Sequence, residues 1–342
     1  MKAARERMKK TLAINTKSSG PSSSSRKKIR SMPETDFAKL YRLGGQVMES
    51  TNAGMQVLFA TRLADGVEVV IKTRKKSKSF KSGTEEREWR STTEVQLNMP
   101  KIETICEFLE VIETKDYYYV IMEKVEGQDL FEHMCQEQLS QVDAREIVRQ
   151  VLDALKNLHD AGRIHKDLKL ENVMVDMDSP KRRGSALSKL SSECPESPAS
   201  VKLIDFDTVQ DWEPSSPKSR DVLGTDGYIA PEAYGGEYSP ASDVYCVGVI
   251  MYKLLTGKFP SNAEIFDDLP GENWVGSPAM KRIQERLKSE RIDFARNPLD
   301  KCPIAAELVA KMLSYEPTER PSADEALAHR WFQLPAAAPY LG

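Results

Sequence analysis

Within the stretch from Tyr41 to about Met122, apolar residues between Val57 and Ile71 alternate with polar or small ones with a period of two. The alternation runs on both sides of Asp65-Gly66, a pair typical of tight turns. The apolar positions are Val57, Phe59, Val67, Val69 and Ile71. Such alternation places one face of a strand against a core, so we predict a β-hairpin here within a small β-rich region.

Farther along the chain, the apolar positions change to the three- and four-residue steps of an α-helix. Ser140, with Asp143 three residues on, resembles a helix-capping pair, and Gly162 is a residue at which such a helix would end. The stripe between them comprises Ile147, Val148, Val151, Leu152, Leu155 and Leu158. A second segment, 244–255, is apolar almost all round, which predicts a buried central helix. With 342 residues, the chain is long enough for two lobes with separate cores.

Composition is that of an ordinary soluble enzyme. The net charge of −3 gives the whole molecule no strong bias toward nucleic acid or membrane. No apolar run approaches the roughly 20 residues needed to span a bilayer, and the N-terminus has no secretory signal. Five scattered cysteines argue against a metal cluster or a disulfide framework and favour a reducing, cytoplasmic compartment.

The first 32 residues differ from the rest in carrying ten Lys and Arg against the single acid Glu6. Such a segment buries too little apolar surface to offset its ordering entropy, so we predict a disordered basic, Ser-rich tail over residues 1–35. Four interpretations of this tail are open: a nuclear-localisation signal, a contact with anionic membranes, a substrate-like segment, or a merely solvated tail.

Three short motifs follow in a fixed order, and each supplies a part needed for phosphoryl transfer. They are 165–172 (HKDLKLEN), 205–207 (DFD) and 230–232 (APE). Asp167 is suited to accept a hydroxyl proton, and Lys169 to neutralise charge on the transferred phosphate. Asn172 and Asp205 are suited to hold Mg²⁺.

With these motifs the chain resembles the eukaryotic protein kinase family, whose motif set is H-R-D-L-x-x-x-N, D-F-G and A-P-E. The resemblance covers roughly residues 36–334 and implies an α+β fold. A small β-rich N-lobe with one main helix (about 36–123) would precede a larger helical C-lobe (about 124–334), with a short tail at 335–342.

The segment 326–332 looks like the calcium/calmodulin-dependent and calcium-dependent kinase group. Only ten residues follow Phe332, so we expect no EF-hand or calmodulin-binding helix there, and we expect a monomer.

The resemblance implies ATP and Mg²⁺ as cofactors and assigns a nucleotide site. Lys72, in the position of the V-A-I-K lysine, would pair with the phosphates and with a glutamate of the next helix. We predict Glu94 as that glutamate, with Glu85, Glu86 and Glu88 as competitors. The carbonyl of Glu123 and the amide of Val125 would bind the adenine edge. The other expected nucleotide contacts are Val57, Val70, Met122, Met174, Asp129, Asn52 and Gly54.

The glycine-rich loop departs most from the family. Kinases carry G-x-G-x-x-G-x-V so that the backbone can press onto the phosphates. Counting back from Val57, the glycine positions fall on Ser50, Asn52 and Met55, and only Gly54 remains nearby. We therefore expect weakened ATP affinity.

Substrate signals favour serine and threonine. Lys169 and Thr225 match the Ser/Thr-kinase pattern. Asp129 and Glu171 match acidic positions that, in basophilic kinases, receive an Arg three residues before the target hydroxyl. Asp129 is also in place to hold the ATP ribose instead. No nucleic-acid partner is expected.

Two further departures and an insert complete the pattern. Asp207 replaces the glycine of D-F-G, which adds charge near the metal and would either aid Mg²⁺ or repel ATP. Lys166 replaces the arginine of H-R-D and lacks its planar fork, so control by activation-loop phosphorylation would be looser. The Ser- and Pro-containing insert 177–200 is predicted to be a flexible surface loop.

The sequence therefore predicts a serine/threonine protein kinase acting on protein substrates. The alternative is a pseudokinase that serves as a nucleotide-binding or scaffold module, because the loop glycines are lost and Asp207 is present.

Overall fold

The computed structural model describes residues 26–48, 53–137, 139–177 and 200–334. Asn52, the insert residues 178–199 and the C-terminal stretch 335–342 lie outside the described residues, as does most of the predicted basic tail.

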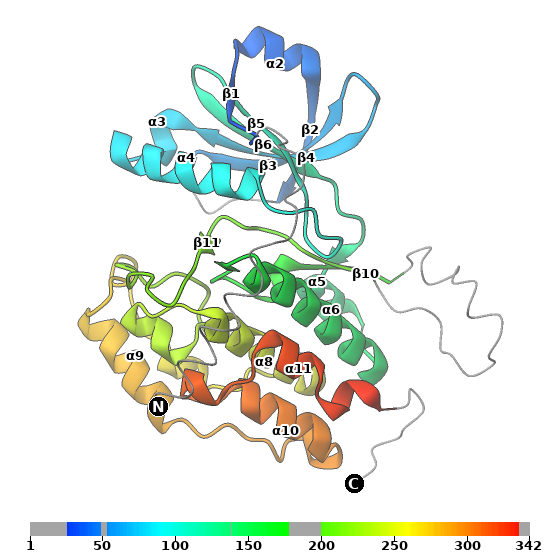
Figure 1. Ribbon diagram of the computed structural model, residues 1–342, viewed down its shortest axis with the longest axis vertical. Helices are drawn as coiled ribbons and strands as arrows, with labels where there is room; N and C mark the ends of the chain where they lie inside the picture. The colour runs from blue at the N-terminus through cyan, green and yellow to red at the C-terminus, as the bar shows by residue number, and fades with distance from the viewer. Residues whose placement is uncertain (1–25, 49–52, 138, 178–199, 335–342) are drawn as a thin grey trace, which may run out of the picture.

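The N-lobe is built on a six-stranded sheet with the order β1-β5-β6-β4-β3-β2. Its strands are β1 (Arg30–Ser31), β2 (Tyr41–Met48), β3 (Met55–Arg62), β4 (Glu68–Lys75), β5 (Phe108–Glu113) and β6 (Tyr117–Glu123). Helices α2 (Glu34–Leu40), α3 (Lys76–Ser79) and α4 (Gly83–Leu97) belong to the same lobe, at the top of Figure 1. The predicted hairpin is confirmed as β3 and β4, which pair antiparallel from Met55–Arg74 to Thr61–Glu68.

The tail predicted to reach residue 35 ends earlier. Arg30 and Ser31 form β1, which pairs in parallel with β5 at Ile112 and Glu113. The backbone amide of Lys27 donates to the side chain of Asn98 at 2.9 Å, and that side chain returns a bond to Lys27 O at 2.9 Å. Neither strand residue is apolar, so β1 forms because the exposed edge of β5 offers backbone partners and not because of its own hydrophobic pattern.

The C-lobe is mostly helical and surrounds α8. Its α-helices are α5 (Leu130–Gln136), α6 (Gln141–Asp160), α8 (Pro240–Thr256), α9 (Pro278–Ser289), α10 (Pro303–Met312) and α11 (Ala323–Leu327). Short 3₁₀ turns are η1 (Leu170–Asn172), η2 (Pro231–Gly235), η3 (Ala263–Ile265), η4 (Leu299–Lys301), η5 (Pro317–Glu319) and η6 (Arg330–Gln333). The two-lobed α+β fold is thus confirmed, with the sheet above and the helices below in Figure 1.

Both predicted helices of the C-lobe are present. The apolar stripe of α6 is buried, and the Ser140 hydroxyl accepts the amide of Asp143 at 3.1 Å. The central helix α8 is buried over nearly its whole circumference, from Ser242 to Tyr252. Burial of so many apolar side chains on two adjoining helices supplies a rigid base for the loops above them.

Two small sheets link this base to the cleft between the lobes. One has the order β10-β9-β7, made of Ser200–Leu203, Val173–Asp176 and Gln128–Asp129, and the other pairs β11 (Gln210–Asp211) with β8 (Arg163–Ile164). The predicted insert joins β9 and β10, which pair antiparallel from Leu203–Val173 to Ser200–Asp176. The segments carrying Asp167 and Asp205 are therefore fixed at both ends by strand pairing.

Candidate active site

The loop after β8 is held in place by a buried carboxylate. Asp243, 1% exposed at the start of α8, accepts the backbone amides of His165 at 2.8 Å and Lys166 at 2.9 Å. His159 Nε2 lies 3.0 Å from the same carboxylate. Burial acts to raise the pKa of Asp243, but the hydrogen bonds and charges of His159 and His165 together outweigh it and keep the pKa below its ordinary value. The loop is thereby fixed by a charge that stays ionised.

The residues predicted for proton acceptance and phosphate neutralisation meet in one cluster. Thr225 donates from Oγ1 to Asp167 Oδ1 at 2.9 Å, and Lys169 Nζ donates to Thr225 Oγ1 at 2.9 Å. Lys169 Nζ also lies 3.8 Å from Asp167 Oδ2. Asn172 donates from Nδ2 to the carbonyl of Asp167 at 2.8 Å, which ties η1 to the same loop. A carboxylate, an amine and a hydroxyl are thus preorganised around one point.

Lys72 reaches from β4 across the cleft to two carboxylates. Its Nζ lies 2.9 Å from Asp205 Oδ1 and 3.0 Å from Asp207 Oδ2. Burial acts to lower the pKa of Lys72, but the charges of Asp207 and Asp205 outweigh burial and raise the pKa above its ordinary value. For Asp205, partial burial acts to raise the pKa, but the charge and hydrogen bond of Lys72 outweigh it and hold the pKa of this carboxyl below its ordinary value. The amine therefore stays protonated, as a phosphate ligand requires.

The predicted pair between Lys72 and Glu94 is not formed, and this expectation is corrected. The buried face of α4 carries Thr93, Gln96 and Leu97, whereas Glu94 is only half-buried. Gln96 donates from its side-chain amide to the carbonyl of Phe206. Since neighbouring helix positions point about 100° apart, a buried Thr93 turns Glu94 away from the inward direction.

Two of the competing glutamates, Glu86 and Glu85, are engaged elsewhere, and Glu88 is exposed. Glu86 accepts the hydroxyl of Tyr118 at 2.6 Å, and Glu85 accepts the backbone amide of Lys81 at 2.6 Å near the start of α4. Among the described residues, the carboxylates within ion-pair distance of Lys72 are those of Asp205 and Asp207.

The expected adenine contacts lie on neighbouring strands of the N-lobe sheet, just after β6, and in β9. Val57 pairs with Lys72 across β3 and β4, and Val70 pairs with Met122 across β4 and β6. Met122 is 9% exposed, whereas the side chains of Val57, Val70, Val125 and Met174 are half-buried. The carboxylate of Glu123 accepts the amine of Lys202 at 2.5 Å and the amide of Glu107 at 2.7 Å.

The part of the glycine-rich loop that is described has one conformationally demanding glycine. Gly54 has φ +75°, and a Cβ at this position would come within 2.7 Å of Lys78 Cβ. Met55, at an expected glycine position, is instead a buried side chain at 8% exposure. Ser50 and Asn52 lie outside the described residues.

The predicted substrate acids have distinct local roles. Asp129 caps α5 by accepting the amide of Glu132 at 2.9 Å, which sequence reasoning missed. Glu171 sits in η1, and among the described atoms its buried Oε2 has no hydrogen-bond partner. Asp129 pairs with Met174 across β7 and β9, three residues from Glu171, so the two acids belong to adjoining segments.

Comparison with known proteins decides the family. A model of the protein kinase domain matches residues 53–332. The chain belongs to the protein kinase family.

Relatives of the kinase include hormonally up-regulated neu tumor-associated kinase homolog A of Xenopus laevis, 28% identical over 90% of this chain and 40% of the relative. Serine/threonine-protein kinase dkf-1 of Caenorhabditis elegans is 30% identical over 87% of this chain and 37% of the relative. Calcium-dependent protein kinase 27 of Arabidopsis thaliana is 28% identical over 90% of this chain and 58% of the relative. The chain thus spans less than two thirds of each relative's length.

In this kinase an ion pair anchors the segment that carries the A-P-E motif at 230–232. Arg320 binds both carboxylate oxygens of Glu232, at 2.7 and 2.8 Å. Lys166, in place of the arginine, has φ +71° and donates to Gln210 Oε1 at 2.9 Å. Burial lowers the pKa of Lys166 to about 8, against a smaller opposing effect of Asp243.

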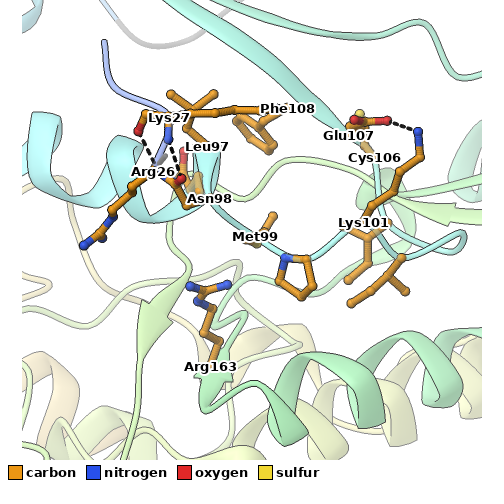
Figure 2. A pocket seen from close by; sticks show the side chains of 14 residues that line it. Arg26, Lys27, Leu97, Asn98, Met99, Lys101, Cys106, Glu107, Phe108 and Arg163 are labelled. Carbon is orange, nitrogen blue, oxygen red and sulfur yellow. Dashed lines mark hydrogen bonds and ion pairs between the residues drawn. The ribbon is translucent and has the colours of Figure 1, made fainter. Parts of the chain in front are cut away.

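A cavity of about 580 Å³ lies behind the junction of the lobes and is separate from these groups. Figure 2 shows the Arg163 guanidinium of β8 directed toward it, with bonded Lys27 and Asn98 on the opposite wall. None of the residues lining the cavity belongs to the predicted nucleotide or catalytic set. No helix within the described part of the kinase is long and apolar enough to cross a membrane.

Proposed function

We propose that this kinase transfers the γ-phosphoryl group of Mg-ATP to serine and threonine hydroxyl groups of proteins. The observation that carries the proposal is the cluster in which Thr225 bridges Asp167 Oδ1 and Lys169 Nζ at 2.9 Å each. A carboxylate that already accepts one hydroxyl has its second oxygen available for the hydroxyl of a substrate. Lys169, beside it, places positive charge where the transferred group would lie.

The residues present fit the cofactors that the family implies. Bound Mg-ATP would supply the phosphoryl donor and the metal charge that offsets its phosphates. Asp205 and Asn172 would hold the metal, because both offer the oxygen ligands that Mg²⁺ prefers. Asn172 uses Nδ2 to hold the carbonyl of Asp167, which leaves its Oδ1 as the ligand atom. Lys72 would hold phosphate oxygens by charge.

Within the active site, each residue then has a separate task. Asp167 orients the substrate hydroxyl and takes its proton at a carboxylate oxygen. Lys169 stabilises negative charge on the oxygens of the transferred group. Asp243 keeps the loop in place through the amides of His165 and Lys166, at 2.8 and 2.9 Å.

A preference for basic substrates is part of the proposal. Asp129 and Glu171 lie on adjoining segments, and two carboxylates favour a guanidinium through charge-assisted bonds. An Arg three residues before the target hydroxyl would meet both acids. The calcium-dependent kinase relative of Arabidopsis is similar over 90% of this chain, which supports placing this kinase near that group.

The test is transfer of radiolabelled phosphate from Mg-ATP to a peptide library, with Asp167→Asn as the inactive control. We expect label on serine and threonine, enriched in peptides with Arg at −3, and at least a roughly 100-fold loss in the variant. Label on tyrosine alone, or equal labelling by Asp167→Asn, would contradict the proposal. Unchanged labelling after Arg is replaced by Ala would remove only the basic preference.

A second candidate function is a pseudokinase that binds nucleotide or partners without transfer. The observation that favours it is Lys72, held by two carboxylates instead of one, which offsets part of its charge toward a phosphate. Nucleotide binding by calorimetry with no transfer to any peptide would establish this candidate.

A further inference from the structure

Asp207 has no counterpart in the kinase motif set, where glycine stands at this position, yet it lies at the centre of a contact network. Its Oδ2 is 3.0 Å from Lys72 Nζ and 3.9 Å from Arg74 Nη2. The Lys72 side chain is 13% exposed and that of Arg74 17%, so both cations are largely removed from water. Asp207 does not have positive φ, so the fold needs no glycine here.

The helix that should supply the partner of Lys72 has no carboxylate at the right level. Trp89 of α4 packs against Arg74, whose guanidinium carbon is 5.2 Å from the indole centroid. About two turns later, Gln96 reaches the carbonyl of Phe206. Thr93 lies between these two contacts on the buried face and is 1% exposed. Because Lys72 precedes Arg74 by two residues on β4, the helix position at the level of Lys72 is Thr93. A threonine cannot form an ion pair.

We propose that Asp207 is the positioning residue that anchors Lys72 in this kinase, replacing the glutamate that α4 lacks. Asp205 is the carboxylate needed for the metal, so Asp207 is the one that stays with Lys72 when nucleotide binds. Arg74 holds Asp207 from the other side and itself lies against the rings of Phe80 and Trp89, 5.4 and 5.2 Å from the centroids. The ion pair itself is observed here, whereas its role toward nucleotide rests on the proposed function.

The anchor has a structural consequence for the cleft. Asp207 belongs to the segment that follows β10, whereas Lys72 belongs to the N-lobe sheet. Lys72 is therefore held by the segment after β10, which α4 contacts through Trp89 and Arg74 and, farther along the helix, through Gln96. A shift of α4 would act on Lys72 through these intermediate contacts instead of breaking a direct ion pair.

The first test needs no nucleotide. The melting temperatures of Asp207→Asn, Lys72→Met and the double variant are compared with that of the unaltered protein. With Lys72 present, Asp207→Asn removes an ion-pair partner and should lower the melting temperature by about 2 °C or more. With Lys72→Met, Asp207 keeps only the longer contact with Arg74 and faces Asp205 without the cation between them, so the same change should lower the melting temperature much less or raise it. If Asp207→Asn changes the melting temperature equally in both backgrounds, Asp207 does not anchor Lys72 and the proposal is overturned.

The second test relocates the carboxylate. Calorimetry with Mg-ATP should show about tenfold weaker binding for Asp207→Gly, although that change restores the family's own residue. Adding Thr93→Glu to Asp207→Gly should recover most of the loss. Thr92→Glu in the same background is the matched control and should recover none, because it adds the same charge one position away on the helix. Melting curves of all variants exclude unfolding.

The outcomes separate this proposal from the proposed function. Equal or tighter nucleotide binding by Asp207→Gly would show that the carboxylate opposes the phosphates and would overturn the role of Asp207. If the unaltered protein binds no nucleotide while the effect of Asp207→Asn on the melting temperature still depends on Lys72, the proposed function fails and the anchor between Asp207 and Lys72 stands.

Discussion

Arg320 and Glu232 form a two-bonded ion pair inside the C-lobe, at 2.7 and 2.8 Å, and the Arg320 side chain is completely buried. The same guanidinium also donates to the carbonyls of Ser314 at 2.7 Å, Tyr315 at 3.0 Å and Ala241 at 3.1 Å. The pair thus connects η2, which carries the A-P-E glutamate, to the start of α8 and the loop after α10. A buried charge with all its partners in place is costly to disrupt on one side only.

Arg320→Met should therefore destabilise the fold by about 3–5 kcal/mol, because Glu232 loses its buried partner. Denaturant unfolding measures this loss. The matched control is Arg296→Met, which breaks an exposed pair with Asp293 at 3.7 Å and should cost no more than about 1 kcal/mol. Equal losses in the two variants would show that Arg320 is not an anchor.

Lys166 predicts a pH dependence of stability with a definite sign. Its pKa falls from the ordinary 10.5 to about 8, mainly through burial, so the folded protein binds this proton less tightly than the unfolded chain. Below pH 8 both states are protonated and folding carries the full cost of a buried charge. The cost declines as the pH rises from about 8 toward 10.5, so the contribution of Lys166 becomes more favourable with rising pH.

The comparison of Lys166→Met with the unaltered protein isolates this contribution from other titrating groups. Between pH 8 and 10 the unaltered protein should gain roughly 2 kcal/mol of unfolding free energy relative to the variant. A difference that stays constant over this range, measured by urea unfolding at each pH, would mean that Lys166 has an ordinary pKa.

The position of Thr225 predicts that its substitution changes kcat but not the KM for ATP. Thr225→Val removes the hydroxyl that bridges Asp167 and Lys169, so kcat should fall by about tenfold or more while the KM for ATP stays unchanged. Thr225→Ser keeps the hydroxyl and should retain most of the activity. Steady-state kinetics with one peptide substrate decide between these outcomes. Failure of Ser to rescue would point to packing of the threonine methyl and not to the hydrogen bonds.

The sequence predicted the parts of the fold whose pattern is set by burial on one face. Alternation around Asp65-Gly66 gave the hairpin of β3 and β4, and the stripe from Ile147 to Leu158 gave α6. In both, an apolar face is long enough to determine the element and its orientation. The motif block likewise predicted that Asp167 and Lys169 act at one site, because they are two residues apart on one loop. In the structure Thr225 contacts this pair through Asp167 Oδ1.

The choice of Glu94 was wrong because α4 has no apolar stripe that would fix its inward face. Its buried residues include the polar Thr93 and Gln96, whose burial depends on partners in other segments. Gln96 is buried against the carbonyl of Phe206, a contact 110 residues away in sequence that no local pattern reports. The strand at Arg30 was missed for a related reason, since its pairing depends on the free edge of β5.

The three expected glycine positions of the glycine-rich loop should respond differently to replacement by glycine. Replacing Ser50 and Asn52 by glycine should tighten Mg-ATP binding about three- to tenfold, because backbone amides could then approach the phosphates. Met55 is buried at 8% exposure, so Met55→Gly should instead destabilise the protein by about 2–5 kcal/mol. The glycine positions of the family are therefore not equivalent in this chain.

Calorimetry with Mg-ATP tests the gain, and unfolding measurements test the loss. Ser50→Ala combined with Asn52→Ala is the matched control, since it shortens both side chains without the backbone freedom of glycine. If the alanine pair tightens binding as much as the glycine pair, removal of side-chain bulk explains the effect. If neither pair changes the affinity, the phosphates are held by Lys72 and the metal-binding residues, and the lost glycines do not weaken ATP binding.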